Sequence, residues 1–445
     1  MLMAKQAVDA PPGPDRAMAA RRLTLALLTA AYFCSYMDRQ ILAIIQELIR
    51  ADLHLTDTQL GLIQGFAFAI FYAGLGIPVA WLADRSNRVN IIAVALALWS
   101  AFTVACGFAG NFTQLLLARI GVGVGEAGSS PPSHSIIADL YPPEQRAGAM
   151  AIYTWGIVFG AFAGTFIGGA VGHAYGWRVA MFAVGAPGIV LAVLIKLLMT
   201  EPRRGLSEVA PLAADSTQPG MGAAFATLWA DRVARHLVIG VTLISGIGYA
   251  YGAFGPSYLQ RSQHLTITQI ITVVAPVAFI ISTVASLSNG QIANRLARRY
   301  GLHAQAWMVA ILHLVGFAPF LLFFLAPTTY GAVGGYWVAL IFVTSYLGPT
   351  FGMIQGRAPI KLRASWAAIT LLSINLIGLG LGPIAVGMLS EHFKPHYGEE
   401  SLRYALLCIV ALGPWPVIHY WRAGVLMKRE RDSGTSTNPV LFRPL

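Results

Sequence analysis

Charged residues are scarce in this sequence. Asp, Glu, Lys and Arg make up 11% of its 445 residues, whereas hydrophobic residues make up 56%. Ordinary soluble domains carry about 25% charged residues, so this class is excluded. The apolar runs continue for about twenty residues or more and lack the alternation typical of barrel strands. The sequence therefore predicts an all-α integral membrane protein.

Other features are missing as well. The three cysteines, Cys34, Cys106 and Cys408, lie inside apolar runs and predict no disulfide framework. The polar stretch up to Ala20 has no apolar core followed by a cleavage site, so no signal peptide is expected. Metal-ligand spacing, a phosphate-binding loop and a nucleophile elbow are all absent from the sequence. We therefore expect neither an enzyme nor a bound cofactor or metal.

Hydropathy predicts twelve spans, separated six and six by a polar linker. The predicted organisation is an N-terminal segment (1–20), a six-helix bundle (21–200), a linker (201–232), a second six-helix bundle (233–425) and a tail (426–445). The spans are placed near 22–47, 58–83, 89–109, 113–139, 147–172, 177–199, 234–260, 268–294, 303–326, 331–357, 363–391 and 402–422.

The net charge of +11 does not indicate nucleic acid, because the basic residues gather beside span ends on one set of loops. By the positive-inside rule this distribution places both termini and the linker in the cytoplasm. The even number of spans agrees with that topology. The expected location is the inner membrane of a bacterium, and the expected state is a monomer.

Four charges lie well inside two predicted spans, away from their ends: Asp38 and Arg39 in the first, and Arg119 and Glu126 in the fourth. A charge at the bilayer centre costs about 3 kcal/mol on insertion scales, and such residues usually mark an ion or substrate path. Seven residues separate Arg119 from Glu126, so they share a helix face about 10 Å apart. Asp38 and Arg39 point about 100° apart around their helix. One arrangement puts Asp38 in a central cavity and lets Arg39 reach Glu126.

These charges predict roles in transport. Asp38, with Glu126 as partner, is the candidate for proton coupling, and a purely structural ion pair is the alternative. Arg39, Arg119 and Glu126 are candidates for substrate binding, since a guanidinium fork suits an anionic headgroup. His134, Tyr153 and Asn375 are weaker candidates at depths that could line a cavity. A kink is expected near His134, because Pro131 and Pro132 precede it.

Glycines recur every four residues in the fifth predicted span, at Gly156, Gly160, Gly164 and Gly168. This spacing makes a flat stripe on one helix face that permits close packing. Two interpretations stay open: plain packing, or a sliding or bending surface between the halves.

An internal repeat supports the two-bundle plan. Asp84-Arg85-Ser-Asn-Arg88 follows the second span, and Asn294-Arg295-Leu-Ala-Arg298 follows the eighth. The first copy resembles the signature loop of the major facilitator superfamily, although Ala80 and Asn87 stand where that family usually has glycine. The resemblance implies twelve helices in two bundles that work by alternating access. It also implies gating roles for Asp84, Arg85, Arg88, Asn294 and Arg295.

The first half has a narrower resemblance. Tyr36-Met-Asp38-Arg39 and the Arg119–Ala127 segment resemble the spinster-like family, as do Asp139-Leu-Tyr-Pro142 and Gly176-Trp-Arg178. Members in animals move sphingosine 1-phosphate or lysophospholipids. The resemblance therefore implies an amphipathic lipid-like substrate, with protons and membrane lipids as the other partners. Two alternatives remain: a drug–proton antiporter, in which Asp38 binds a cation, or a small organic anion symporter anchored by Arg119.

Overall fold

The computed structural model of the chain is helical throughout the part that it describes, residues 14–204, 206, 220–344, 346–359 and 362–434. The first half runs through α1 (Pro14–Leu53), α2 (Asp57–Gly61), a π-helical turn η1 (Leu62–Phe66), α3 (Ala67–Arg85), α4 (Arg88–Cys106), α5 (Phe112–Glu126), α6 (Ser130–Leu140), α7 (Pro143–Tyr175) and α8 (Trp177–Leu198).

The second half repeats this plan. It comprises α9 (Met221–Ala230), α10 (Arg232–Arg261), α11 (Ile267–Gln269), η2 (Ile270–Val274), α12 (Ala275–Tyr300), α13 (His303–Leu325), α14 (Thr329–Val343), α15 (Leu347–Arg357), α16 (Arg363–Ser373), η4 (Ile374–Leu379), α17 (Gly380–Tyr397), η5 (Gly398–Glu400), α18 (Ser401–Val410) and α19 (Pro414–Asp432).

Within the described residues, nine helical stretches are long and apolar enough to cross a membrane by composition alone. The stretch Ser365–Asp432 contains two passes, α16–α17 and α18–α19. The other two passes are α1, which carries Asp38 and Arg39, and α5–α6, which is divided into helices of 15 and 11 residues. The predicted twelve-helix organisation is thereby confirmed. Differences occur at the edges, since α9 lies inside the predicted linker and α19 continues into the predicted tail.

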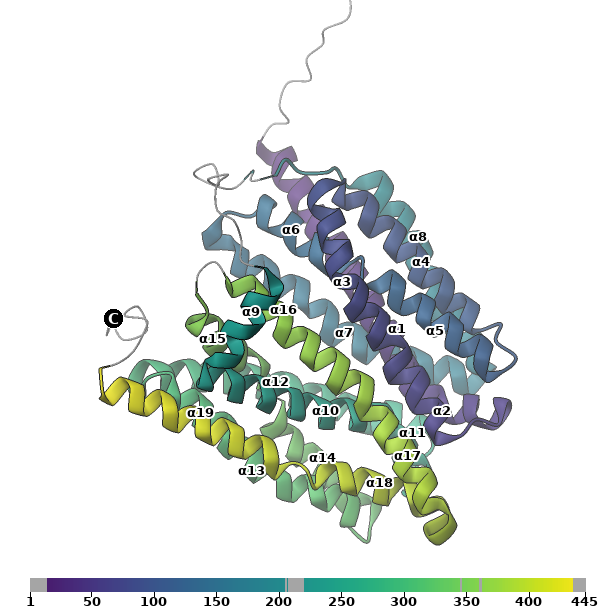
Figure 1. Cartoon of the computed structure of the whole chain (residues 1–445). Coiled ribbons are helices and arrows are strands. Elements are labelled where there is room, and N and C mark those ends of the chain that lie inside the picture. The colour runs from purple at the N-terminus through teal and green to yellow at the C-terminus, as the bar shows by residue number, and fades with distance from the viewer. Residues whose placement is uncertain (1–13, 205, 207–219, 345, 360–361, 435–445) are drawn as a thin grey trace, which may run out of the picture.

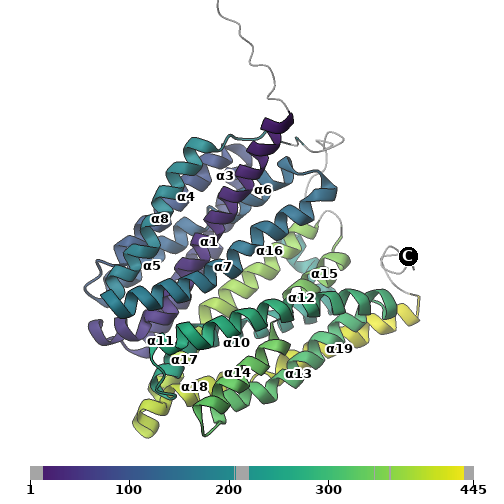
Figure 2. The ribbon, with the colours of Figure 1, turned by 180° about the vertical axis from the view of Figure 1, so that it is seen from behind.

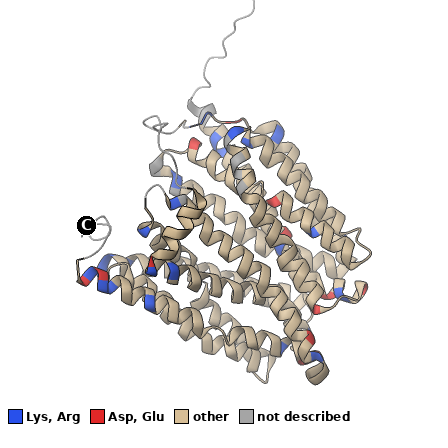
Figure 3. Cartoon of the chain, viewed as in Figure 1, with Lys and Arg blue, Asp and Glu red and all other residues tan. Residues whose placement is uncertain are grey.

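The two halves form separate bundles that meet at one end and spread at the other (Figure 1). We call these the joined end, where α2, α11 and α17 meet, and the open end, where α6, α9 and α16 lie (Figures 1 and 2). At the joined end α2 and η1 pack directly on α17. A Cβ added to Gly61 would lie 2.5 Å from the backbone oxygen of Pro383, so glycine is required for this approach. Lysine and arginine gather at the open end (Figure 3).

The glycine stripe of α7 faces α1 of the same half. A Cβ at Gly164 would lie 2.5 Å from the Met37 oxygen, and one at Gly156 would lie 2.8 Å from the Thr29 oxygen. The packing interpretation therefore accounts for the stripe. Because α7 holds α1 this closely, the backbone position of Asp38 and Arg39 is fixed.

Candidate functional site: buried charges in the N-terminal half

An ion pair joins α1 to α5 in the interior of the first bundle. Glu126 Oε2 accepts hydrogen bonds from Arg39 Nε at 2.8 Å and from Ser35 Oγ at 2.8 Å, and Arg39 Nη2 lies 2.6 Å from the same oxygen. The Glu126 side chain is 1% exposed and that of Arg39 is 17% exposed. The predicted contact between Arg39 and Glu126 is therefore present, and Arg39 is its more accessible member.

Small residues deliver Glu126 to this position. A Cβ at Gly123 would lie 2.8 Å from the Phe68 oxygen, and one at Gly125 would lie 2.6 Å from the Trp99 nitrogen. The glycines thus allow α5 to pack closely on α3 and α4. The helix then ends at Glu126, and α6 begins at Ser130, so the kink expected in this span is confirmed.

Aromatic rings surround the Arg39 guanidinium. Its central carbon lies 4.5 Å from the ring centre of Phe68, 4.9 Å from that of Tyr72 and 5.1 Å from that of Tyr36. Ring faces attract cations, and they do so more strongly where water is excluded. The three rings therefore stabilise the positive charge of Arg39 without a second carboxylate. The guanidinium can then bind another anion.

Asp38 and Arg119 lie deeper, at 2% and 3% exposure. The neighbours of Asp38 include Arg119 and, from α4, Trp99 and Thr103. We expected Asp38 to face a central cavity, but it points into the interior of its own bundle. The 100° step between consecutive helix positions explains this difference, because Arg39 takes the direction of α3 and leaves Asp38 facing α4 and α5.

Three atoms of this cluster are buried without a hydrogen-bond partner among the described residues: Asp38 Oδ1, Arg119 Nε and Glu126 Oε1. Unpaired buried polar atoms are costly and rare, and they call for a functional explanation or a bound molecule. Two of the three are carboxyl oxygens that could accept a proton.

His134 and Tyr153 lie together beside α1. The rings of Tyr153 and Tyr32 stack with centres 4.4 Å apart, and the His134 ring meets Tyr153 edge-on at 5.4 Å. His134 is exposed, whereas Tyr153 is fully buried. Asn375 is different: it lies in η4 of the other half and its amide donates to the Leu371 oxygen of its own helix. The structure thus groups two of the three weaker candidates.

The predicted gating residues divide into one buried residue and several exposed ones. Arg88 is 1% exposed and donates to Glu201, Asp139, Ser135 and the Pro202 oxygen, all in the first half. It therefore holds the start of α4 to α6 and to the segment after α8. Exposed positions are Arg85, Asn294 and Arg295, and the side chain of Asp84 lies outside the described residues. Their gating role stays a prediction.

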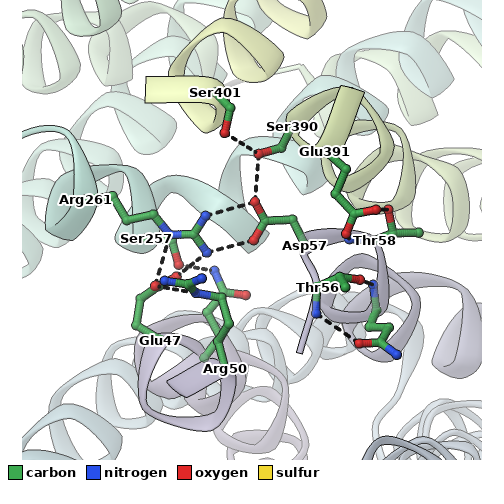
Figure 4. A network of polar contacts seen from close by, with 12 residues as sticks. Glu47, Arg50, Thr56, Asp57, Thr58, Ser257, Arg261, Ser390, Glu391 and Ser401 are labelled. Atoms are coloured by element: carbon green, nitrogen blue, oxygen red, sulfur yellow. Dashed lines mark hydrogen bonds and ion pairs between the residues drawn. The ribbon is translucent and has the colours of Figure 1, made fainter. Parts of the chain in front are cut away.

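A second charge cluster connects the halves at the joined end (Figure 4). Arg261 of α10 donates to Glu47 of α1 at 2.7 and 2.9 Å, and to Asp57 of α2 at 2.8 and 2.9 Å. Asp57 also accepts a hydrogen bond from Ser390 of α17 at 2.7 Å. Glu391 accepts bonds from the Thr58 backbone and hydroxyl at 3.1 and 2.8 Å. We call Glu47, Asp57, Arg261, Ser390 and Glu391 the clasp.

The clasp was not predicted from the sequence. Its charges stand at span ends, where basic and acidic residues are ordinary, and Arg261 gave only a topology signal. The available signal was the capping box at Thr56–Gln59, which places Asp57 at a helix start. Nothing in the sequence relates that start to α10, more than two hundred residues later.

The second half encloses an apolar cavity of about 250 Å³ among α10, α13, α14 and α19. Tyr251, Tyr336, Phe317 and Phe320 supply aromatic walls. His313 also lines the cavity, with Nδ1 3.0 Å from the Val309 oxygen. A cleft of about 420 Å³ between α7 and α12 shares Tyr251 and Tyr336 with this cavity. Apolar space therefore lies within the C-terminal half and between α7 and α12 of the two halves, whereas the buried charges lie within the N-terminal half.

The sequence matches a known protein family and several of its members. Residues 28–385 match the model of the Major Facilitator Superfamily. An MFS-type efflux pump of Mycolicibacterium smegmatis is 32% identical over 94% of this chain and 95% of its own length. The chain belongs to the major facilitator superfamily, and it is an integral, multi-pass membrane transporter.

Spinster proteins are among its relatives. A sphingosine-1-phosphate transporter of Danio rerio is 25% identical over 94% of this chain and 87% of its own. The crystal structure of a bacterial homologue of the human lysosomal transporter Spinster, inward-facing and unoccupied, superposes with a TM-score of 0.83 at 27% identity, covering 92% of this chain and 98% of that one. The spinster-like resemblance found in the sequence is thereby confirmed.

Proposed function

We propose that this transporter is proton-coupled and exports an amphipathic lysolipid- or sphingolipid-like molecule by alternating access. The observation that carries the proposal is the cluster of Asp38, Arg39, Arg119 and Glu126. It places two cations and two carboxylates in the interior of one bundle, with an unpaired oxygen on each carboxylate. Charges this deep are costly in a membrane and are usually functional.

Proton and substrate are linked through Arg39 in this proposal. Glu126 is its carboxylate partner, at 2.6 Å, and a proton on Glu126 would neutralise that partner. The charged form of Glu126 competes with an anionic headgroup for the same guanidinium fork, and protonation of Glu126 removes that competition. Two ligands that compete for or share one group change each other's affinity by the same factor. Asp38 acts beside Arg119 as the deeper proton site.

The headgroup and the tail have different places to bind. Arg39 in its aromatic cage, with His134 and Tyr153 nearby on α6 and α7, offers cationic and hydrogen-bonding groups. The cleft between α7 and α12 and the adjoining apolar cavity offer room for a hydrocarbon chain. This division suits a molecule with one charged end and one apolar end.

The basic residues at the open end indicate which side of the membrane that end faces. By the positive-inside rule the open end faces the cytoplasm, so the described conformation is open inward, as that of the bacterial Spinster homologue is named. The two cytoplasmic repeats, around Arg85 and Arg295, would act as gates when the halves close there. We place the protein in a bacterial inner membrane as a monomer.

The test is uptake of a fluorescent lysophospholipid into proteoliposomes, with and without an imposed pH gradient. Wild type should accumulate the lipid only when the gradient is imposed. Asp38→Asn should not accumulate the lipid under either condition. Asp52→Asn is the matched control, because Asp52 is a 44% exposed carboxylate on the same helix. Lipid transport that ignores the gradient in wild type would remove proton coupling from the proposal.

Relatives support two other substrates. The efflux pump favours a drug–proton antiporter, and a probable sulfoacetate transporter of Cupriavidus necator, 26% identical over 88% of this chain, favours a small organic anion. A cationic dye and sulfoacetate should be assayed in the same vesicles. Transport of the dye alone, unaffected by Arg119→Ala, would replace the lipid proposal with drug efflux.

A further inference from the structure

A basic hollow lies at the open end, where α10 begins and α19 ends. Its volume is about 500 Å³. The polar side chains lining it are all basic: Arg232, Arg235, His236, Arg422 and Arg429. Val425 and Leu426 complete the lining. We call this the basic hollow, and it belongs wholly to the C-terminal half, outside the charge cluster of the N-terminal half.

Neighbouring acids do not neutralise these arginines. Asp231 and Glu430 are the carboxylates beside them in sequence, and both bind Arg357 instead. Arg357 Nε lies 3.0 and 3.1 Å from the two Asp231 oxygens, and its Nη1 lies 2.7 Å from Glu430. Across the described parts of the chain, no carboxylate forms a salt bridge with the four arginines of the hollow.

Four like charges around one hollow repel one another unless an anion enters. Among the described residues, Arg235 donates only to the backbone oxygen of Trp229, at 3.3 Å, so most of its N–H groups have no acceptor there. His236 and His419 share a hydrogen bond of 2.9 Å between their Nδ1 atoms, which holds α10 to α19 beneath the arginines. The histidine pair therefore fixes α10 against α19, and the arginines of the hollow have N–H groups that could donate to a phosphate.

The adjoining helix indicates where the anion comes from. Along α9 the exposed large side chains are Met221, Phe225 and Trp229, spaced by four residues, while Ala224 and Leu228, beside them on the helix surface, are fully buried. Phe225 and Trp229 stack with ring centres 5.8 Å apart. A short helix with an outward apolar stripe lies in the boundary of a membrane, with its side chains among the headgroups.

The stripe ends at Trp229, three residues before Arg232, and the Arg235 side chain donates to the Trp229 backbone oxygen. Trp421 of α19, 49% exposed, is a further aromatic residue at the same end. Aromatic and apolar groups beside a cluster of arginines favour a molecule that is anionic at one end and apolar at the other. A free phosphate ion could bind the arginines but would make no favourable contact with the apolar stripe.

We propose that the basic hollow binds the phosphate headgroup of an anionic membrane lipid, whose chains lie against α9. Arginine-lined pockets between helices at this depth are suited to such headgroups, and each basic residue near the surface adds about a fivefold attraction. The site does not depend on the identity of the transported substrate. It is a second lipid site that ties α9, α10 and α19 to the membrane.

The experiment measures lipid binding by the full-length protein, using native mass spectrometry after exchange into mixed phosphatidylcholine and phosphatidylglycerol. The test variant is Arg422→Gln with Arg429→Gln; both side chains are exposed, so the fold should persist. The matched control is Arg298→Gln with Arg299→Gln, exposed arginines at the end of α12 that remove the same charge elsewhere. Inorganic phosphate is added to separate samples in phosphatidylcholine alone.

Wild type and the Arg298/Arg299 control should retain phosphatidylglycerol, and the Arg422/Arg429 variant should bind it at least tenfold more weakly. Phe225→Ser with Trp229→Ser should also weaken lipid binding while leaving the arginines in place. Equal loss in both arginine variants would reduce the effect to general surface charge and overturn the proposal. Binding of inorganic phosphate as tight as that of phosphatidylglycerol in the same mass spectra would overturn the lipid assignment.

Discussion

The two halves of this transporter share one helical plan but differ in what they bury. The N-terminal half buries Asp38, Arg119 and Glu126, with Arg39 at the edge. The C-terminal half encloses an apolar cavity whose polar groups are hydroxyls and one imidazole. The two repeats of the fold therefore differ in chemistry: one half buries charge, and the other encloses apolar space. Under the proposed function, the first would handle the proton and the headgroup, and the second would accommodate the tail.

The largest effect is expected from breaking the buried pair. Arg39→Ala would leave Glu126 buried without its cation, which typically costs 3–5 kcal/mol. The variant should melt at a markedly lower temperature in detergent and should not transport. Arg39→Met combined with Glu126→Gln should recover most of the stability but not the coupling. A double variant as unstable as the single one would show that the pair is not the source of the loss.

Asp38→Asn should abolish gradient-driven transport while leaving the protein folded, because asparagine keeps the shape of this buried side chain. Thermal melting and uptake should be measured on the same preparation. Asp52→Asn should behave as wild type in both. Full coupling in Asp38→Asn would move the proton site away from the N-terminal interior.

The clasp tests how the halves stay together. Arg261→Gln removes four hydrogen bonds to two carboxylates across the interface. Bonds to charged groups are each worth about 1.5–3 kcal/mol, so opening at the joined end should increase by tenfold or more. A thiol introduced at the buried Ser257, with Cys408 replaced by serine, should label faster in this variant.

Arg403→Gln provides the control for that labelling. Arg403 lies in α18 near the same end, but its contacts, Phe324 and Glu400, stay within one half. It should leave the labelling rate unchanged. Equal acceleration in the two variants would mean that the clasp does not hold the halves together.

The smallest effect is expected from filling the apolar cavity. Gly248 lines it and has open space where a Cβ would be placed, so Gly248→Leu should fold normally. Each methylene excluded from apolar contact costs about 0.8 kcal/mol, which is about fourfold in binding. The KM for long-chain lysolipids should therefore rise several-fold, and that for short chains less. Gly290→Leu, also in open space, is the control; equal KM changes would exclude the cavity from the tail path.

Hydropathy and residue spacing were enough to predict the helical plan and the buried charges of the N-terminal half. The angle between Asp38 and Arg39 even predicted the contact with Glu126. The same reasoning misplaced Asp38, because the direction of a side chain depends on which helices surround it. The clasp and the basic hollow were not predicted for a related reason. Arg261 and Arg422 stand at span ends, where charge is expected, and the role of each depends on residues far away in the sequence.

The most direct test of the division between the halves is proton movement in proteoliposomes that contain a pH-sensitive dye. Adding lysophospholipid to wild-type vesicles should change the internal pH, and the change should be absent in Asp38→Asn and retained in Gly248→Leu at saturating lipid. A substrate-dependent pH change of normal size in Asp38→Asn would contradict the account.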